Sequence, residues 1–384
     1  MLMPVLARRL GLIGFASFAV LTGIAQYATL GVELGLNYVG MSEIKRASSQ
    51  CAQRSIFSEI FYLKVILALV VCVTLTIAST FSQLPTIVNK ATFAFLLSGP
   101  LASCIVCPVW FFILKNRLDI NFNIVFGSRF CLLFLCYFFV RGPQDYIKAV
   151  AFFNFATLPF AAIYAAQWLP NLTSPTVLKQ RALFMRLQSG LQLSGAMLRE
   201  TITNVGVAPL YGLFVFHSEL GSYAFAEKMS KIFTMPAPVF AAAIMTSTSN
   251  EQKGLQIPRL VTQLPLWASA IVFVLLYGTV AIAIKIAVNR FFPQFATSIP
   301  MVYLMASISP LVYFNYVELG MRYTKQGRFR FAAKMSYAYL VSLFVTALCL
   351  SAFYGVWGLA IAVCTTEILQ TILLLKFRKS DAAS

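Results

Sequence analysis

The chain has 384 residues, of which 59% are hydrophobic and 11% are charged, and its formal net charge is +18. A soluble domain of this length cannot bury so much apolar side-chain surface, so the composition excludes a soluble globular protein. The CxxC formed by Cys104 and Cys107 has no second pair and no neighbouring histidine, and no nucleotide-binding loop is present. The composition therefore predicts a polytopic membrane protein without a metal or other cofactor.

Apolar runs of about 20 residues are typical of membrane-spanning helices. Such runs follow one another along the chain with short connections, and we expect about eleven spans: 11–33, 57–81, 91–114, 122–140, 149–168, 185–215, 222–246, 263–287, 299–321, 331–353 and 356–375. The short connections leave no room for a soluble catalytic domain, so the expected fold class is an all-α polytopic membrane protein.

A polar, proline-containing stretch lies near the middle of the chain. Proline and turn-forming residues such as Pro170, Asn171 and Pro175 mark a linker. We therefore expect an N-terminal helical lobe over 1–168, a linker over 169–184 and a C-terminal lobe over 185–384. Most basic loop residues fall on the side that also holds the linker and the C-terminus, which predicts that this side is cytoplasmic.

Several ionisable residues fall inside the expected spans, where a charge is costly and usually functional. The stretch 195–233 predicts two helices joined by a turn at 217–221, and both helices carry charges. A cationic, water-filled cavity would suit an anionic headgroup such as a diphosphate, which arginine binds with two parallel hydrogen bonds. The candidate substrate-binding residues are Arg199, Arg129, Lys64, Lys228 and Lys231, and the candidates for coupling or ion pairing are Glu200, Glu227 and Glu367.

Some of these charges also have a plain structural interpretation. Lys64 lies about two turns into its helix and could extend to the cytoplasmic interface. Glu227 and Lys231 are four residues apart and could neutralise each other on one helix face. The tyrosines near these charges could stack on sugars or could serve only in packing: Tyr211, Tyr223, Tyr313 and Tyr316.

Three stretches resemble the Wzx-type polysaccharide flippases. The opening ARRLG turn and LGLNYVGMSEIKRAS (Leu34–Ser48) are similar to the start of that family, ELGSYAFAEKMSKIF (Glu219–Phe233) to the start of its second lobe, and GVWGLAIAVCTTEILQTILLL (Gly355–Leu375) to its last helix. The family-pattern positions in these stretches are Glu43, Glu227, Lys228 and Glu367.

The resemblance implies the fold of the multidrug/oligosaccharidyl-lipid/polysaccharide exporters, with two six-helix lobes around a central cavity and alternating access. It also implies a substrate, an undecaprenyl-diphosphate-linked oligosaccharide such as an O-antigen unit, that crosses the bacterial inner membrane from the cytoplasmic to the periplasmic leaflet. A polysaccharide polymerase and a chain-length regulator are the implied protein partners.

The chain departs from the family pattern at two places. It begins where the first family helix should end, so that helix is expected to be missing. Its third span keeps Pro108 and Trp110 but lacks the glutamine and glutamate that many relatives carry after them. Three alternatives remain at this point: a multidrug or lipid II exporter of the same superfamily, a polysaccharide polymerase or ligase, or a channel or structural membrane protein. We expect no enzyme, because no arrangement of catalytic side chains is present.

Overall fold

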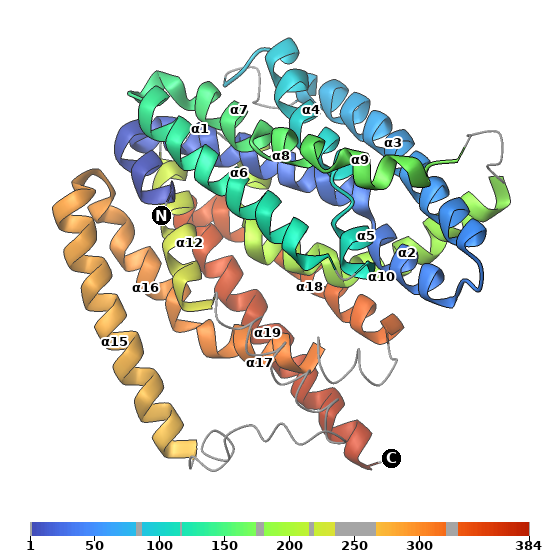
Figure 1. Ribbon diagram of the computed structural model, residues 1–384. Coiled ribbons are helices and arrows are strands. Elements are labelled where there is room, and N and C mark those ends of the chain that lie inside the picture. Colours follow the sequence, from blue (N-terminus) through green and yellow to red (C-terminus); the bar gives the residue numbers. More distant parts are fainter. Residues whose placement is uncertain are drawn as a thin grey trace. The chain divides into compact units, whose positions relative to one another are not determined.

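The computed structural model describes residues 2–81, 87–115, 117–173, 180–214, 219–234, 266–319 and 329–383, and every regular element in these residues is a helix. The chain divides into two units, Met1–Gly221 and Ser222–Ser384 (Figure 1). The expected all-α membrane fold is confirmed.

The first unit is built around α1 (Leu2–Glu33), which packs against α3, α4, α7 and α11. Its helices in chain order are α1, α2 (Leu36–Arg46), α3 (Gln50–Ala78), α4 (Lys90–Val106), α5 (Val109–Leu114), α6 (Leu118–Phe139), α7 (Tyr146–Phe155), α8 (Thr157–Ile163), α9 (Ala165–Trp168), α10 (Gln180–Val205) and α11 (Ala208–Phe214), with short 3₁₀ turns η1 (Ser79–Phe81), η3 (Pro143–Asp145) and η4 (Leu169–Asn171).

Two glycines determine the course of α1. Gly11 has a φ of 63°, a left-handed value that favours glycine, and it separates the short helix of residues 2–10 from the long helix that follows. Gly23 lies so close to the ring of Pro209 that an added Cβ would overlap it, so this glycine permits the tight contact between α1 and α11.

Arg9 connects the start of α1 to the end of α6. Its Nη1 donates to the backbone oxygens of Cys136 (3.2 Å), Tyr137 and Val140 (2.7 Å), and its guanidinium lies 4.8 Å from the Tyr137 ring centroid. The last carbonyls of a helix have no partner within the helix. Arg9 therefore caps the C-terminal end of α6. This role is structural and does not indicate a contact with substrate.

The second unit contains most of α12 (Glu219–Thr234), α15 (Leu266–Phe291), the 3₁₀ turn η6 (Pro293–Ser298), α16 (Ile299–Ser307), α17 (Ser309–Val317), α18 (Phe329–Tyr354) and α19 (Val356–Ala383). The helices α18 and α19 pack against each other along their length and are joined at Gly355, whose φ is 56°. α16 and α17 pack on α19, which is thus the central helix of this unit.

Large apolar side chains cover the outside of several helices. On α3 they recur every three or four residues and are about half exposed or more: Ile66, Leu69, Val70, Val73 and Ile77. An exposed apolar stripe of this length is what lipid chains cover. Eight helical stretches in the described residues are long and apolar enough to cross a membrane, so the chain is a multi-pass membrane protein.

These eight stretches correspond to eight of the expected spans. The other three differ for identifiable reasons. The expected span 185–215 falls on α10 and α11, of which α10 is rich in polar residues, and 222–246 begins with α12 but extends beyond the described residues after Thr234. The last, 263–287, overlaps α15. The expected span number is therefore approximate.

The boundary between the two units lies at Gly221, downstream of the linker expected over 169–184. The reason is that α10, which follows the expected linker, packs on α1, α2 and α3 and therefore belongs to the first unit.

Candidate functional site

Arg199, the first candidate for substrate binding, lies on α10 in the first unit and is only 6% exposed. The helix carries Arg186 and Arg199 together with several amide and hydroxyl side chains, which makes it the most polar of the long helices in the described residues. The neighbouring Glu200 belongs to the same helix, but its side chain lies outside the described set. Burial of an arginine in such a helix is typical of a functional position.

A partly buried ionic network holds the other end of α10. Arg186 Nε lies 2.7 Å from Glu43 Oε2 on α2, and Arg186 Nη1 pairs with Glu59 on α3. Glu59 also accepts a hydrogen bond of 2.9 Å from Ser55. One guanidinium thus joins three helices, an arrangement that suits arginine because its planar group presents several donors.

Sequence reasoning missed this network. Of its three members it selected only Glu43, as a family-pattern position. Arg186 is 143 residues from Glu43 and 127 residues from Glu59 along the chain. The spacing of these residues in the sequence could not have revealed their contact. The weak signal was that Arg186 and the oppositely charged Glu43 and Glu59 all lie near the ends of apolar runs.

Lys64 is 4% exposed on α3 and belongs to a chain of polar contacts. Its Nζ donates to Asn37 Oδ1 at 2.7 Å, and Asn37 Nδ2 donates to Glu33 Oε1 at 3.0 Å. The tight turn at Gly35, with a φ of 75°, brings Glu33 and Asn37 into this position. Lys64 is therefore held by polar side chains at the turn between α1 and α2.

Arg129 behaves differently from these two cations. It lies on an exposed face of α6, with its guanidinium 5.7 Å from the centroid of the Phe153 ring. A contact of this kind is a cation–π interaction. Arg129 is therefore available to a ligand or to lipid headgroups, in contrast to the buried Lys64 and Arg199.

In the second unit, α12 carries the charges expected at its centre. Glu227 is 4% exposed and accepts a hydrogen bond of 3.1 Å from the hydroxyl of Tyr223. Lys228 and Lys231 both interact electrostatically with Glu227, and their ammonium groups approach each other. The helix face therefore holds two lysines and one glutamate close together. Tyr223 is fully buried and serves in packing as well as in this hydrogen bond.

Glu367 is the buried carboxylate of α19, with 1% exposure. Its Oε2 accepts from Asn315 Nδ2 at 2.7 Å, and its Oε1 accepts from the Tyr339 hydroxyl at 2.9 Å. The Thr371 hydroxyl donates to Asn315 Oδ1 at 3.0 Å and orients that amide. Sequence reasoning selected Glu367 but missed Asn315 and Tyr339, which come from α17 and α18.

The structure describes all eight cysteines of the chain but not its histidine. All eight cysteines are free thiols. In the part of the chain that the structure describes, no group of three or more His, Cys, Asp and Glu side chains is arranged to hold a metal ion. His217 lies outside the described residues.

Comparison with known proteins gives two results. Residues 1–248 match the family model described as "Polysaccharide biosynthesis protein". A solved structure, described as "Inward-facing conformation of a multidrug resistance MATE family transporter of the MOP superfamily", aligns over 99% of this chain and 93% of its own, with a TM-score of 0.64 and 14% identity. At this identity the likeness shows the fold alone.

No curated protein matches the chain significantly. The family match and the fold likeness nevertheless agree with the resemblance that three sequence motifs had indicated, and that resemblance is confirmed.

Proposed function

Since the chain belongs to the polysaccharide biosynthesis protein family, we propose that it is a flippase of the bacterial inner membrane. Its substrate is a polyprenyl-diphosphate-linked O-antigen unit or a related oligosaccharide repeat unit, which it moves from the cytoplasmic to the periplasmic leaflet. Its two lobes work by alternating access, its C-terminus lies in the cytoplasm, and it performs transport rather than catalysis.

The observation that carries this proposal is the burial of cations inside the first unit. Lys64 and Arg199 are 4% and 6% exposed, on helices α3 and α10. A buried charge in a membrane protein costs at least about 2.5–3.5 kcal/mol, so it persists where function requires it. A diphosphate must leave water to cross the bilayer, and a buried guanidinium replaces its hydration with charge-assisted hydrogen bonds.

The remaining candidate residues fit the same scheme. Arg129, Lys228 and Lys231 are further contacts for the anionic headgroup in this proposal. Glu227 and Glu367, with Glu200 beside Arg199, are the carboxylates available for coupling or ion pairing. A polysaccharide polymerase and a chain-length regulator are the partners that would consume the flipped unit.

A multidrug exporter of the same fold is the main rival, since the similar solved structure is described as a multidrug resistance transporter. The buried cations argue against the transport of cationic drugs, because like charges repel each other. A lipid II exporter would share the diphosphate chemistry and is distinguished by its sugar and peptide. The polymerase is the weakest rival, because it would need catalytic groups that the sequence does not indicate.

Complementation tests the proposal. The native gene is deleted in its host, the full chain is supplied on a plasmid, and long-chain surface polysaccharide is scored as a ladder on a gel. We expect restored ladders with the wild-type chain and none with Arg199→Ala, at unchanged protein abundance. The matched control is Lys148→Ala, which removes an exposed cation that pairs with Asp145 at 2.7 Å and should leave the ladder intact.

Absence of a ladder with the wild-type chain, despite normal abundance, contradicts the flippase assignment. Increased drug resistance in the same strain would then favour the multidrug rival, and rescue of peptidoglycan synthesis would favour the lipid II exporter. Loss of abundance in Arg199→Ala would assign this arginine a structural role instead.

A further inference from the structure

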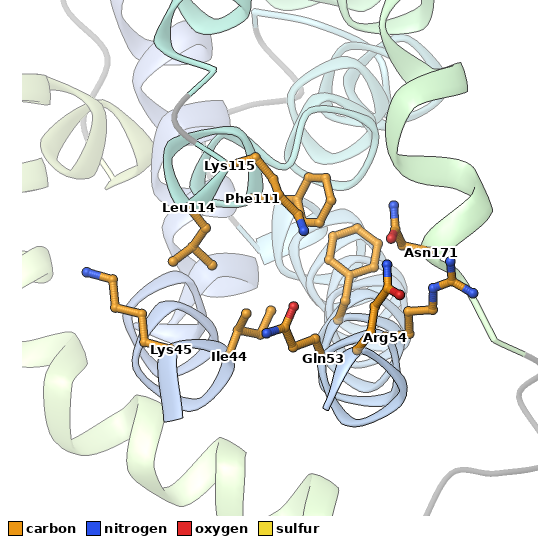
Figure 2. A pocket seen from close by; sticks show the side chains of 10 residues that line it. Ile44, Lys45, Gln53, Arg54, Phe111, Leu114, Lys115 and Asn171 are labelled. Atoms are coloured by element: carbon orange, nitrogen blue, oxygen red, sulfur yellow. The ribbon is translucent and has the colours of Figure 1, made fainter. Parts of the chain in front are cut away.

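A cavity of about 260 Å³ opens at one end of the first unit, where α2 ends, α3 begins and α5 ends (Figure 2). Residue Asn171 of η4 closes one side. The cavity is slightly smaller than the range of about 300–1,000 Å³ typical of pockets for drug-sized ligands. It is therefore large enough for a headgroup but too small for a complete oligosaccharide.

The floor of this cavity is a packed aromatic cluster. Phe57 and Phe111 are 1% and 7% exposed, and their ring centroids are 4.8 Å apart. Trp110 and Trp168 pack on Phe57 at 5.5 and 6.2 Å between ring centroids. A floor built from the hydrophobic core of the unit is preformed, so a ligand would not have to order it.

The wall at Asn171 is also fixed. The Thr173 backbone N–H donates to Ser58 Oγ at 2.7 Å, and the Tyr62 hydroxyl donates to the Thr173 carbonyl at 3.1 Å. Both partners lie on α3. The segment that follows η4 is thereby held against the same helix that supplies Phe57 and Arg54 to the cavity.

The rim is strongly cationic. Figure 2 shows Lys45 on α2, Arg54 on α3 and Lys115 just after α5 on three sides of the cavity. All three side chains are exposed, and the Lys115 ammonium lies 5.8 Å from the Phe111 ring centroid. No carboxylate is among the residues that line the cavity.

The nearest acidic side chains in sequence are already engaged elsewhere. Glu43 and Glu59 pair with Arg186, and Asp119 pairs with Arg117 at 3.0 Å. These three carboxylates therefore do not neutralise the charges of the rim cations. The amide side chains of Gln50 and Gln53 complete the lining and offer both hydrogen-bond donors and acceptors.

The cavity also lies at the ends of helices that are able to cross a membrane. The stretches Met3–Arg46, Gln50–Phe81 and Lys90–Leu114 are three of the helical stretches able to cross a membrane, and the cavity is formed by their adjoining ends. All three ends were assigned to the cytoplasmic side by the loop charges. Basic pockets between membrane helices at this level bind phosphate-bearing headgroups.

We infer that this cavity captures the phosphate-linked sugar headgroup of the lipid substrate at the cytoplasmic leaflet before translocation, an inference that rests on the proposed flippase function. Arg54, Lys45 and Lys115 bind phosphate oxygens. The amides of Gln50, Gln53 and Asn171 bind sugar hydroxyls, and the aromatic cluster beneath holds these side chains in place. The capture site is distinct from the buried cations Lys64 and Arg199.

A binding experiment with the full-length protein in phosphatidylcholine nanodiscs tests this inference. The probe is a fluorescent short-chain polyprenyl diphosphate N-acetylglucosamine, and its binding is followed by anisotropy after subtraction of protein-free nanodiscs. The test variant combines Lys45→Gln, Arg54→Gln and Lys115→Gln. The control variant combines Arg46→Gln, Lys334→Gln and Lys376→Gln, three exposed cations that do not line the cavity.

We expect the test variant to bind the probe about tenfold more weakly or worse, because three charge-assisted contacts are lost. The control variant should change binding by less than about twofold, because its charges act only through solvent. Both variants should melt at the same temperature as the wild type, since they alter exposed side chains. Phosphatidylglycerol at the same mole fraction should not displace the probe, because it lacks the sugar.

Unchanged binding by the test variant overturns the inference, and so does displacement by phosphatidylglycerol, which would make the cavity a phospholipid site. Probe transport by the wild type is measured in vesicles from the same preparation. If the wild type transports the probe while the test variant binds it normally, the capture site fails and the flippase function stands. If the wild type neither binds nor transports it, both fail.

Discussion

The Arg186 and Lys64 clusters of the first unit and the Glu367 cluster of the second unit hold their charges in different ways. In the first unit, Arg186 pairs directly with Glu43 and Glu59, and Lys64 reaches Glu33 through Asn37. In the second unit, the Glu367 carboxylate accepts hydrogen bonds from Asn315 and Tyr339, which are neutral. Deleting one ion of a buried pair leaves an uncompensated charge, whereas deleting a neutral donor costs one hydrogen bond.

This difference predicts that the first unit is the more sensitive to charge removal. Its helices α2, α3 and α10 are joined by a single guanidinium. The helices α17, α18 and α19 of the second unit share a network in which each member makes its own contacts. The following substitutions test this difference, in order of decreasing expected effect on stability.

Arg186→Ala should have the largest effect on stability. The substitution leaves Glu43 and Glu59 as neighbouring carboxylates without their cation. Loss of one partner of a buried pair costs about 3–5 kcal/mol, and because the Glu43 side chain is 36% exposed, we expect the lower end of this range. The free energy of unfolding, measured by titration with sodium dodecyl sulfate, should fall by this order. Arg186→Lys should recover only part of it, because an ammonium cannot match the guanidinium geometry. A loss below about 1 kcal/mol would show that the network is solvated like a surface pair.

Lys64→Met should have an intermediate effect. The methionine fills most of the lysine volume and removes a buried charge, but it leaves Asn37 Oδ1 without its donor, at a cost of about 1–3 kcal/mol. The same unfolding titration measures the change. Asn37→Asp provides the contrast, because it gives Lys64 a direct carboxylate partner. An equal loss in both variants would contradict the role of Asn37 as the link between Lys64 and Glu33.

Tyr339→Phe should have a smaller effect, because it removes a single hydrogen bond to Glu367, worth about 0.5–1.5 kcal/mol, or up to about 3 kcal/mol if that carboxylate is ionised. Combining it with Glu367→Gln, which keeps the shape of the side chain, should give less than the sum of the two single effects because the residues share one interaction. A destabilisation by Tyr339→Phe as large as that of Arg186→Ala would remove the distinction between the two units.

Reversing Glu227 and Lys231 on α12 should have the smallest effect on stability, because the face keeps its charges and loses one hydrogen bond. The Tyr223 hydroxyl no longer donates to a carboxylate at position 227, which costs about 0.5–1.5 kcal/mol of unfolding free energy. We expect transport to fail in this double variant, because Lys231 is proposed to contact the anionic headgroup. Wild-type surface polysaccharide from the double variant would mean that the two residues only neutralise each other.

The sequence predicted the fold class well, because apolar runs of sufficient length report the membrane environment directly. It also selected Lys64, Arg199 and Glu367, all of which are buried, because a charge inside an apolar run is conspicuous in a linear pattern. The sequence provided less information on α10, because the many polar residues of this helix do not indicate that it packs within the first unit.

The contacts that the buried Glu367 makes with other helices could not be predicted from the sequence. Asn315 and Tyr339 are 52 and 28 residues from Glu367, and neither position is unusual in its own helix. The capture cavity likewise joins three connections that are separate in the sequence. Hydropathy and helix spacing describe one element at a time, whereas these arrangements depend on how different helices pack.

A flip assay in proteoliposomes tests the central claim most directly. The full-length chain is reconstituted with a polyprenyl-diphosphate-linked oligosaccharide that carries a fluorophore, and dithionite added outside quenches only the outer leaflet. We expect the wild-type protein to move labelled lipid from the inner to the outer leaflet, where dithionite quenches it. We expect no such movement with Arg199→Ala, and no transport of a fluorescent cationic drug by the wild type. Transport of the drug with no movement of the lipid-linked oligosaccharide would contradict the account.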